Sequence, residues 1–430
     1  MIDLEQEKAD LVLRAFLVGF QAPQESESLI FAQLDELAEL VRTLDIIPLE
    51  PEVVKLRSAP QSRYCIGSGK AEELAQLARE CEADIMVFDT GLTPSQQRNW
   101  ERLFGGPVIG REEIILDIFA ERASTREAVL QVELARLEYS MPRLTRAWSH
   151  LSRQRGGGAT NRGQGEAQIE NDRRMLRRRI QQLREELTEV RKQRAAQRKA
   201  RTRRPVLQGA IVGYTNVGKS SLLHALTGAD ILVKDQLFAT LDPTARHIDL
   251  DNNTEMVLSD TVGFVRKLPH QLIEAFKSTL EEAALADILL LVLDISGDDI
   301  DNEWETTLGV LKELGADEKR IMVVFNKYDL IDEEQDAVKL ARLRGLFPQA
   351  VYISSASGYG LEELRRRLSE FAGENRNLLR VLLPPHRHDL IALAHKTGAV
   401  YEEKYTADGS AEIVMALEEK FLHHFKGFVQ

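Results

Sequence analysis

The residues with the clearest chemical potential form a glycine-rich loop near the middle of the chain. An apolar stretch ends in glycine, and a second glycine, a lysine and a serine follow at the spacing G-x-x-x-x-G-K-S before a helical pattern. Such a loop brings backbone N–H groups to phosphate oxygens, the lysine neutralises those oxygens, and the serine hydroxyl can bind Mg²⁺. The predicted nucleotide-binding residues of this loop are Gly213, Asn216, Val217, Gly218, Lys219, Ser220 and Ser221.

Two further segments would complete a phosphate and magnesium site. A strand pattern ends at Asp260 in the sequence D-T-V-G, where the carboxylate can hold Mg²⁺ and the N–H of Gly263 can meet a γ-phosphate. Between these motifs we expect Thr240 to close on metal and phosphate, with Thr244 as a weaker candidate. The predicted metal ligands are Ser220, Thr240 and Asp260, and the predicted catalytic residues are Lys219, Thr240, Gly263 and Asn216.

Two later loops carry the signals of base recognition. The sequence N-K-Y-D follows the strand pattern I-M-V-V-F, and S-S-A follows A-V-Y-I. The carboxylate of Asp329 can accept hydrogen bonds from two guanine N–H groups that adenine does not offer, and the N–H of Ala356 can face the guanine O6. These motifs in register predict a Ras-like GTPase domain with a P-loop, whose base-binding residues are Asn326, Lys327, Asp329, Ser354, Ser355 and Ala356.

The position after the D-x-x-G glycine predicts slow unaided hydrolysis. Ras-type GTPases place a glutamine there to orient the attacking water, whereas this chain has Phe264. Asn216 occupies the position at which several such GTPases coordinate K⁺, and that ion could supply the positive charge otherwise given by an arginine. An ordinary role in stabilising the loop fits Asn216 equally well. The predicted cofactors are therefore Mg²⁺ and, on the first interpretation of Asn216, K⁺.

The remaining segments predict the elements that would position this site. Residues 1–110 alternate buried-strand patterns at 15–20 and 84–88 with an amphipathic helix at 29–44, which favours a small α/β domain on a parallel sheet. Residues 67–70 resemble a second phosphate loop but lack its first glycine and its hydroxyl residue, so a turn leading into a helix is favoured. The P-loop GTPase domain is predicted over 205–372, and a small α+β domain with a turn at 407–409 over 378–430.

Residues 111–204 predict a long antiparallel helical hairpin. Apolar residues recur at heptad spacing from Leu130 to Leu151 and again from Leu176 to Val190, with a glycine-rich stretch at 156–165 between them. No helix of this kind tolerates so many glycines, so we expect two helical arms joined by a glycine-rich tip. We also expect Pro142 to kink the first arm. Trp100 and Trp148 are most simply packing residues, and His423 is expected in a terminal helix.

The charge of the chain is concentrated on the second arm. The net charge is −12, yet residues 173–204 hold 14 Arg and Lys against three Glu. A basic element on an acidic body indicates a polyanionic partner, although a solvated helix face with surplus arginine would show the same composition. With two cysteines, no apolar run long enough for a membrane span and an acidic N-terminus, we expect a cytoplasmic, monomeric protein without a transmembrane segment.

Several strings surrounding these motifs together resemble one family. They are YCIGSGKAEEL, LTPSQQRNWE, ILDIFAERASTRE, QVELARLEY and LSRQRGGGATNRGQGE, with FATLDPT and DTVGF in the GTPase segment. Over residues 10–375 the chain resembles the HflX family of ribosome-associated GTPases. The family's tip usually resembles GGIGTRGPGE, whereas this chain has Gln164 in place of the proline and a different loop at 159–161.

The resemblance implies a GTP- and GDP-binding partner of the large (50S) ribosomal subunit and its rRNA, not of DNA. It implies hydrolysis stimulated by that subunit and, in some members, splitting or rescue of stalled or idle ribosomes under stress, with the hairpin tip leading towards the peptidyl-transferase region. A ribosome-biogenesis GTPase and an RNA-remodelling ATPase that uses the N-terminal domain remain alternatives. The candidate RNA-binding residues are Arg153, Arg155, Arg162, Arg173, Arg174, Arg177, Arg178 and Arg184.

Overall fold

The protein is described by a computed structural model that divides into two compact units. The N-terminal unit extends to Gln193 and also includes Leu237, Phe238 and Arg266, while the C-terminal unit holds the remaining described residues. The structure describes residues 12–56, 59–143, 162–201, 207–228, 237–238, 244–250, 254–266, 282–297, 299–374, 377–406, 408–417 and 421–429.

The N-terminal unit is built on a parallel sheet, as the strand patterns predict. The strand order is β2-β1-β4-β5, and β3 also pairs with β1. Its strands are β1 (Arg14–Gln21), β2 (Ile47–Pro48), β3 (Glu52–Lys55), β4 (Ile85–Phe88) and β5 (Val108–Gly110). Its first helices are α1 (Glu27–Thr43), α2 (Ser68–Glu80) and α3 (Pro94–Phe104).

Trp100 has the packing role expected of it. Its side chain is fully buried, its indole N–H donates to the carbonyl of Tyr64 at 3.2 Å, and its ring lies 4.9 Å from that of Phe88. Trp148 lies outside the described residues. The G-S-G-K segment forms a turn into α2, with Gly67 as the N-cap, so it is not a second phosphate loop.

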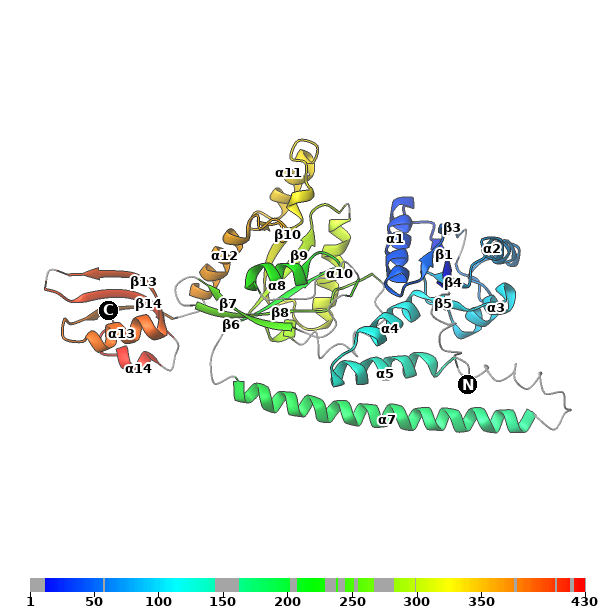
Figure 1. Ribbon diagram of the computed structural model, residues 1–430, viewed down its shortest axis with the longest axis horizontal. Coiled ribbons are helices and arrows are strands. Elements are labelled where there is room, and N and C mark those ends of the chain that lie inside the picture. The colour runs from blue at the N-terminus through cyan, green and yellow to red at the C-terminus, as the bar shows by residue number, and fades with distance from the viewer. Residues whose placement is uncertain are drawn as a thin grey trace, which may run out of the picture. The chain divides into compact units, whose positions relative to one another are not determined.

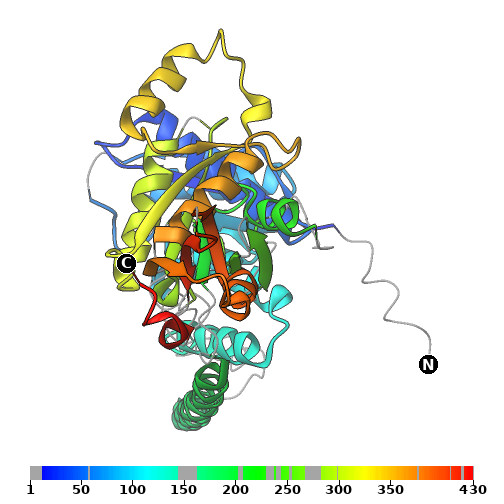
Figure 2. The same cartoon turned by 90° about the vertical axis from the view of Figure 1, so that its left-hand side faces the viewer.

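Two helical arms lie side by side in the same unit. Figures 1 and 2 show the 40-residue helix α7 (Arg162–Arg201) beside α5 (Arg126–Ser140), which follows α4 (Arg111–Arg122). The two heptad seams face each other, because Leu130, Leu183 and Leu187 are buried in one cluster flanked by Leu134, Leu137 and Val190. The predicted antiparallel pairing of the arms is confirmed over these residues.

Two ion pairs between α5 and α7 flank the apolar seam. Arg179 of α7 donates from two nitrogens to both carboxylate oxygens of Glu133 at 2.9 Å, and Arg184 donates to Glu138 at 2.8 Å. Both acceptors lie on α5, so each contact links the arms directly. Bidentate pairing of arginine with a carboxylate fixes orientation as well as distance.

The ends of the arms differ from the sequence prediction. Helix α5 ends at Ser140 and Pro142 lies in a turn, so the helix is interrupted where the kink is expected, and the rest of the first heptad pattern, from 144 to 151, lies outside the described residues. Proline cannot donate the backbone hydrogen bond that would continue the helix. At the other end α7 begins at Arg162 and contains Gly163 and Gly165, which the sequence pattern assigns to the tip. A cost of about 1 kcal/mol for each glycine is small for a helix of this length that packs on a second arm.

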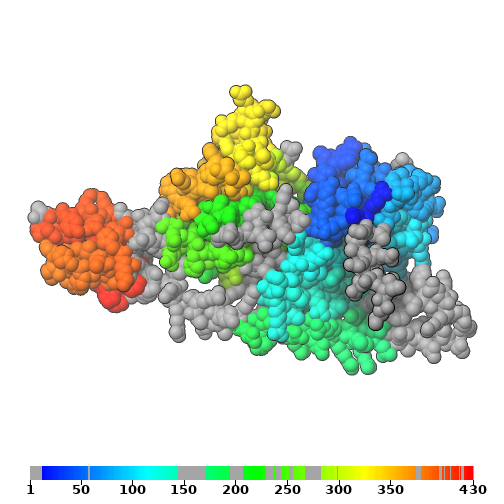
Figure 3. Space-filling model, in the orientation of Figure 1, coloured from blue at the N-terminus to red at the C-terminus, as the bar shows by residue number. Residues whose placement is uncertain are grey.

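The C-terminal unit holds a six-stranded sheet in the order β11-β10-β9-β6-β8-β7, parallel except for β7. Its strands are β6 (Leu207–Gly213), β7 (Thr244–Leu250), β8 (Thr254–Asp260), β9 (Ile288–Asp294), β10 (Arg320–Asn326) and β11 (Val351–Tyr352). The helices are α8 (Lys219–Thr227), α10 (Ile300–Glu313), α11 (Ala337–Leu346) and α12 (Leu361–Glu374), and α11 projects from this unit in Figure 3. This arrangement confirms the predicted P-loop GTPase fold.

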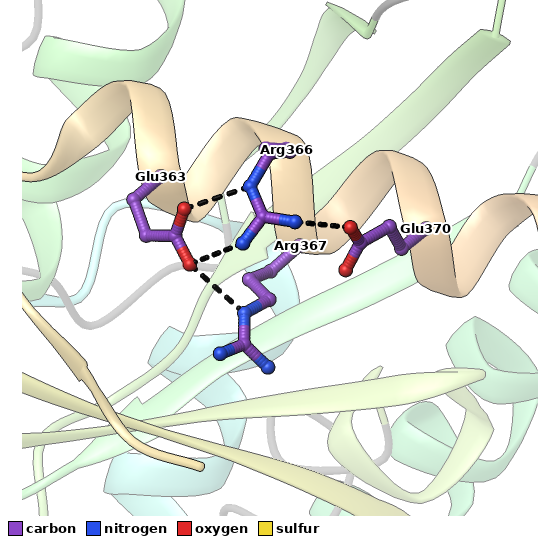
Figure 4. Close-up of polar contacts among 4 residues, drawn as sticks. All are labelled: Glu363, Arg366, Arg367 and Glu370. Carbon is purple, nitrogen blue, oxygen red and sulfur yellow. Dashed lines mark hydrogen bonds and ion pairs between the residues drawn. The ribbon is translucent and has the colours of Figure 1, made fainter.

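Helix α12 carries an ion-pair network on its surface (Figure 4). Glu363 accepts hydrogen bonds from Arg366 at 2.6 and 2.8 Å and from Arg367 at 3.0 Å, while Arg366 also pairs with Glu370. These contacts, that with Arg366 first, lower the pKa of the Glu363 carboxyl to about 2. Arg365 on the same helix donates to the carbonyl of Leu226 and so holds α12 against the end of α8.

The chain ends in a small antiparallel sheet in the order β12-β14-β13. It comprises β12 (Asn377–Leu383), β13 (Gly398–Tyr405) and β14 (Ala411–Leu417), with α13 (His388–Thr397) and the short α14 (Leu422–Phe425). The predicted turn connects β13 to β14, where Gly409 has a φ of 81°, although residue 407 itself is not described. His423 lies in the terminal helix as expected. Across the described residues, every helix is too short or too polar to traverse a bilayer.

Leu183 provides a test of the hairpin seam. Its side chain is fully buried, and truncation of such a leucine costs about 3 kcal/mol. We expect Leu183→Ala to speed amide hydrogen exchange in α5 and the facing part of α7 by about two orders of magnitude, without a change in the β1–β5 sheet. Met175→Ala, at a position 67% exposed on the same helix, is the matched control. Wild-type exchange in Leu183→Ala would show that the seam does not hold the arms together.

Candidate nucleotide-binding site

The loop between β6 and α8 requires glycine at two positions. Gly218 caps α8 with a φ of 89°, and a Cβ there would lie 2.3 Å from the side-chain nitrogen of Asn326. Gly213 ends β6 with a φ of 149°, and a Cβ there would lie 2.2 Å from the carbonyl oxygen of Val292. The predicted spacing of glycines is therefore a steric requirement of this loop.

Lys219 is buried at the centre of the loop. Its ammonium nitrogen donates to the carbonyls of Gly213 at 3.2 Å and Tyr214 at 2.6 Å. Burial lowers the pKa of this lysine to about 8, against the opposing effect of the negative charges of Asp260 and Glu303. A buried cation held in this way can neutralise phosphate oxygens with little reorganisation.

The two described candidate metal ligands lie together. The hydroxyl of Ser220, at the start of α8, donates to a carboxylate oxygen of Asp260 at 2.6 Å. Asp260 is 1% exposed and ends β8, which pairs directly with β6. Hard oxygen donors of this kind fit Mg²⁺, which proteins bind through one or two carboxylates together with phosphate oxygens and water. Among the described residues there is no cluster of three or more acidic, histidine or cysteine side chains that could hold a metal ion.

Gly263 lies against the phosphate loop. A Cβ at this position would come within 2.7 Å of the Thr215 side chain and 3.0 Å of the ammonium nitrogen of Lys219. The backbone of this segment is also tied to the loop, because Phe264 donates to the carbonyl of Gly213 at 3.1 Å and accepts from Thr215 at 2.8 Å. The N–H of Gly263 is thus near the place where Lys219 would meet a phosphate.

Phe264 has no means of orienting a water molecule. Its ring is 1% exposed, and its backbone is occupied by the two hydrogen bonds to the phosphate loop. A glutamine in Ras-type enzymes presents an amide at this position. Slow unaided hydrolysis stays a prediction from this substitution of phenylalanine for glutamine.

Asn326 joins three loops at the base-binding end of the site. Its side-chain N–H donates to the carbonyl of Val217 at 2.8 Å, and its side-chain oxygen accepts from the N–H of Ser355 at 3.0 Å. The residue is 1% exposed, so its side-chain amide lies almost entirely out of water. The structure therefore brings the phosphate loop, the N-K-Y-D segment and the S-S-A segment together as predicted.

The other base-loop residues lie around this bridge. Lys327, with a φ of 64°, forms an ion pair with Asp294 at 2.7 Å. Ser354 is fully buried, while Asp329 is exposed in a short 3-10 turn and Ala356 lies in the turn after Ser355. This leaves the Asp329 carboxylate accessible to a ligand.

A pair of tyrosines braces the two base loops, a feature that the motif analysis missed. Tyr328 and Tyr359 stack with their ring centroids 5.0 Å apart and their planes 8° from parallel. Tyr328 also donates from its hydroxyl to Glu333 at 2.7 Å. The only signal in the chain was a tyrosine inside N-K-Y-D and a second one shortly after S-S-A.

Thr240, the favoured metal-closing threonine, lies outside the described residues. The weaker candidate Thr244 begins β7 and lies directly opposite Asp260 in the antiparallel pair β7–β8. Of the remaining loop residues, Val217 is buried, Asn216 is exposed with a φ of 61°, and Ser221 lies in α8.

The candidate RNA-binding arginines divide into two groups. Arg184 is committed to Glu138 of the facing arm. By contrast, Arg174, Arg177 and Arg178 are exposed, and together with the half-buried Arg173 they form no ion pair with another described residue. Arg162 begins α7, whereas Arg153 and Arg155 lie outside the described residues.

Arg143 fixes the root of the segment that leads to the tip. It donates to the side chain of Gln97 at 3.1 Å and to the carbonyls of Leu92 at 3.0 Å and Tyr139 at 2.9 Å. Its guanidinium also lies 3.4 Å from the centroid of the Tyr139 ring. These contacts join the end of α5 to helix α3 and to the loop just before it.

Comparisons with known proteins cover most of the chain. Three family models match in order: GTP-binding GTPase N-terminal over residues 32–120, GTP-binding GTPase Middle Region over 122–201, and 50S ribosome-binding GTPase over 208–327. GTPase HflX of Akkermansia muciniphila is 48% identical over 413 residues, covering 94% of both chains. GTPase HflX of Treponema denticola is 49% identical over 344 residues, covering 78% of this chain and 86% of the relative.

One solved structure, a GTP-binding protein from the hyperthermophilic archaeon Sulfolobus solfataricus in complex with GDP, is 26% identical. It covers 84% of this chain and 99% of that chain, with a TM-score of 0.42.

The lowered pKa of Lys219 predicts a pH-dependent affinity for the nucleotide. In the free protein Lys219 is half deprotonated at about pH 8, whereas a bound triphosphate favours the charged form. Binding must then take up a proton, and affinity should fall roughly fivefold to tenfold between pH 7.2 and 8.8. Calorimetry of Mg²⁺–GTP binding in buffers of different ionisation enthalpy measures this uptake. Equal proton uptake at both pH values would contradict the assignment.

Proposed function

Because the chain belongs to the HflX family of GTPases, and therefore binds GTP and hydrolyses it, we propose that it acts on the large (50S) ribosomal subunit. The resemblance stated from the motifs is confirmed by these relatives. In the proposed cycle the GTP-bound protein binds ribosomal RNA and splits or rescues stalled or idle ribosomes under stress. Hydrolysis then releases it.

The observation that carries the ribosome proposal is the exposed arginine face of α7. Arg174, Arg177 and Arg178 project from a helix of an otherwise acidic protein and have no ion-pair partner among the described residues. Arginines that served only to hold the hairpin would be paired, as Arg179 and Arg184 are. Unpaired guanidinium groups on one helix suit the closely spaced phosphates of a nucleic acid.

Each residue of the nucleotide site would have a separate role in binding and hydrolysing GTP. Lys219 would neutralise the β- and γ-phosphates, Ser220 and Asp260 would hold Mg²⁺, and the N–H of Gly263 would meet the γ-phosphate. When bound, Mg²⁺ neutralises charge that develops on the phosphate oxygens. Asp329 would select guanine, because adenine would leave its carboxylate without donors. We propose Thr240 as the third metal ligand from the chain.

The same proposal covers the remaining properties expected from the sequence. We propose a cytoplasmic monomer whose nucleic-acid partner is ribosomal RNA and not DNA. Outside residues 173–204 the chain carries a net charge of −23, which suits selective, salt-dependent binding to one partner better than general attraction to polyanions.

The ribosome proposal is tested by GTP turnover with and without purified large subunits. We expect a clear stimulation by the subunits for the wild-type protein. Changing Arg174, Arg177 and Arg178 to glutamate should weaken cosedimentation and reduce the salt dependence by roughly 0.7 to 0.9 logarithmic units for each phosphate that the variant no longer binds. GTP affinity should not change.

A charge-matched control changes Arg102, Lys312 and Lys396 to glutamate, since all three are exposed and lie on other elements. This control should bind large subunits as the wild type does. Wild-type binding by the α7 variant, or turnover that does not respond to large subunits, would overturn the proposal.

We also propose that Asn216 holds K⁺ beside the phosphates. Its positive φ is accessible to asparagine and to glycine, so Asn216→Gly removes the side-chain oxygen without straining the loop. Turnover of the wild type should be several-fold higher in K⁺ than in Na⁺, and Asn216→Gly should abolish that difference. Equal wild-type turnover in the two salts would leave Asn216 with a loop-stabilising role alone.

A further inference from the structure

Thr215 lies buried in the phosphate loop with an unpartnered hydroxyl. The residue is 6% exposed, and its hydroxyl oxygen is buried without a hydrogen-bond partner among the described residues. By contrast, the buried hydroxyl of Thr261, directly after β8, donates to the carbonyl of Ile211 at 2.7 Å. A buried hydroxyl without a partner costs free energy, and such groups are uncommon in folded proteins. The hydroxyl of Thr215 is therefore a candidate for a contact with the substrate.

Thr215 is held between the phosphate loop and the D-T-V-G segment. Its backbone N–H donates to the carbonyl of Phe264 at 2.8 Å. A Cβ at Gly263 would come within 2.7 Å of the Thr215 methyl carbon, 2.8 Å of its Cα and 3.0 Å of the ammonium nitrogen of Lys219. The Thr215 side chain, the Lys219 ammonium group and the backbone of Gly263 thus meet in one place.

These neighbours indicate which part of the nucleotide the hydroxyl would meet. Lys219 donates to the carbonyl of Tyr214, the residue directly before Thr215, at 2.6 Å. Lys219 would neutralise the β- and γ-phosphates, and the N–H of Gly263 would meet the γ-phosphate. Phosphate oxygens accept hydrogen bonds, and a threonine hydroxyl can donate one. A γ-phosphate oxygen would therefore satisfy the group that the protein leaves without a partner.

We propose that Thr215 is a catalytic residue whose hydroxyl donates a hydrogen bond to a γ-phosphate oxygen of GTP. Catalysis of phosphoryl transfer depends on positioning and on stabilising the charge of the γ-phosphate oxygens, and a buried donor does both. GDP has no γ-phosphate, so the hydroxyl distinguishes the two nucleotides. The proposal rests on the GTPase reaction of the family and on the roles proposed for Lys219 and Gly263, and does not depend on ribosome binding.

The test is single-turnover hydrolysis of saturating GTP without ribosomes, together with the affinities for GTP and GDP. Thr215→Val keeps the branched shape of the side chain and removes its hydroxyl. We expect this variant to hydrolyse GTP roughly tenfold to a hundredfold more slowly and to bind GTP roughly tenfold more weakly. Its affinity for GDP should stay at the wild-type value. Thr215→Ser keeps the hydroxyl and should retain most of the rate, and Thr215→Ala carries the test if the valine variant does not fold.

Two controls separate a catalytic role from a structural one. Because the Thr215 hydroxyl has no partner within the described protein, Thr215→Val should leave the thermal stability of the nucleotide-free protein unchanged or raise it. Thr307→Val is the matched variant, since Thr307 is fully buried on α10 and its hydroxyl likewise has no partner among the described residues. Helix α10 provides none of the proposed nucleotide contacts, so Thr307→Val should hydrolyse GTP at the wild-type rate.

A wild-type rate in Thr215→Val would overturn the proposal. Equal losses of affinity for GTP and GDP, a lower thermal stability of Thr215→Val, or an equal loss of rate in Thr307→Val would do the same. A slower rate with wild-type affinity for GTP would assign the hydroxyl to the attacking water and would also overturn the phosphate contact. Each of these outcomes leaves the stimulation by large subunits, and hence the ribosome proposal, to be decided by its own experiment.

Discussion

The side-chain amide of Asn326 is the interaction on which the nucleotide site depends. One end of the amide holds the phosphate loop at Val217, and the other holds the loop after β11 at Ser355. Parallel strands deliver their loops to a common edge of the sheet but do not fix the spacing of those loops. The buried side-chain amide of Asn326 fixes this spacing, because both of its ends are hydrogen-bonded. Gly218 has no Cβ and therefore leaves room for the amide.

A second constraint separates structural charge from charge that a partner can reach. In the helical arms, Arg179 and Arg184 are committed to carboxylates of the facing helix, whereas Arg174, Arg177 and Arg178 are directed to solvent. The amino-acid composition does not distinguish these five arginines, because it does not show where the carboxylates that could pair with them lie. The structure shows that Arg174, Arg177 and Arg178 are exposed and form no ion pair with another described residue. We infer the proposed partner from this exposed group.

The sequence predicted those features that depend on local spacing. The glycine spacing around Lys219 and the apolar runs of the parallel strands show as local patterns in the chain itself, and the structure has the loop and these strands where expected. The start of the second arm was predicted wrongly, because packing between the arms stabilises a helix that contains Gly163 and Gly165. The stacking of Tyr328 on Tyr359 joins distant positions, and no single-sequence pattern records such a contact. The predicted role of Thr240 stays a prediction.

The small sheet at the C-terminus has two differently protected borders. On the β12 side, the chain covers its own strand, because the N–H of Leu382 donates to the carbonyl of Phe428 and Val381 bridges to Val429. The opposite border, β13, presents the exposed charges of Glu402 and Lys404. Open strand borders invite pairing with another molecule, and charged side chains discourage it. Both borders are therefore arranged so that the sheet stays three strands wide when it meets an unpaired strand of another molecule.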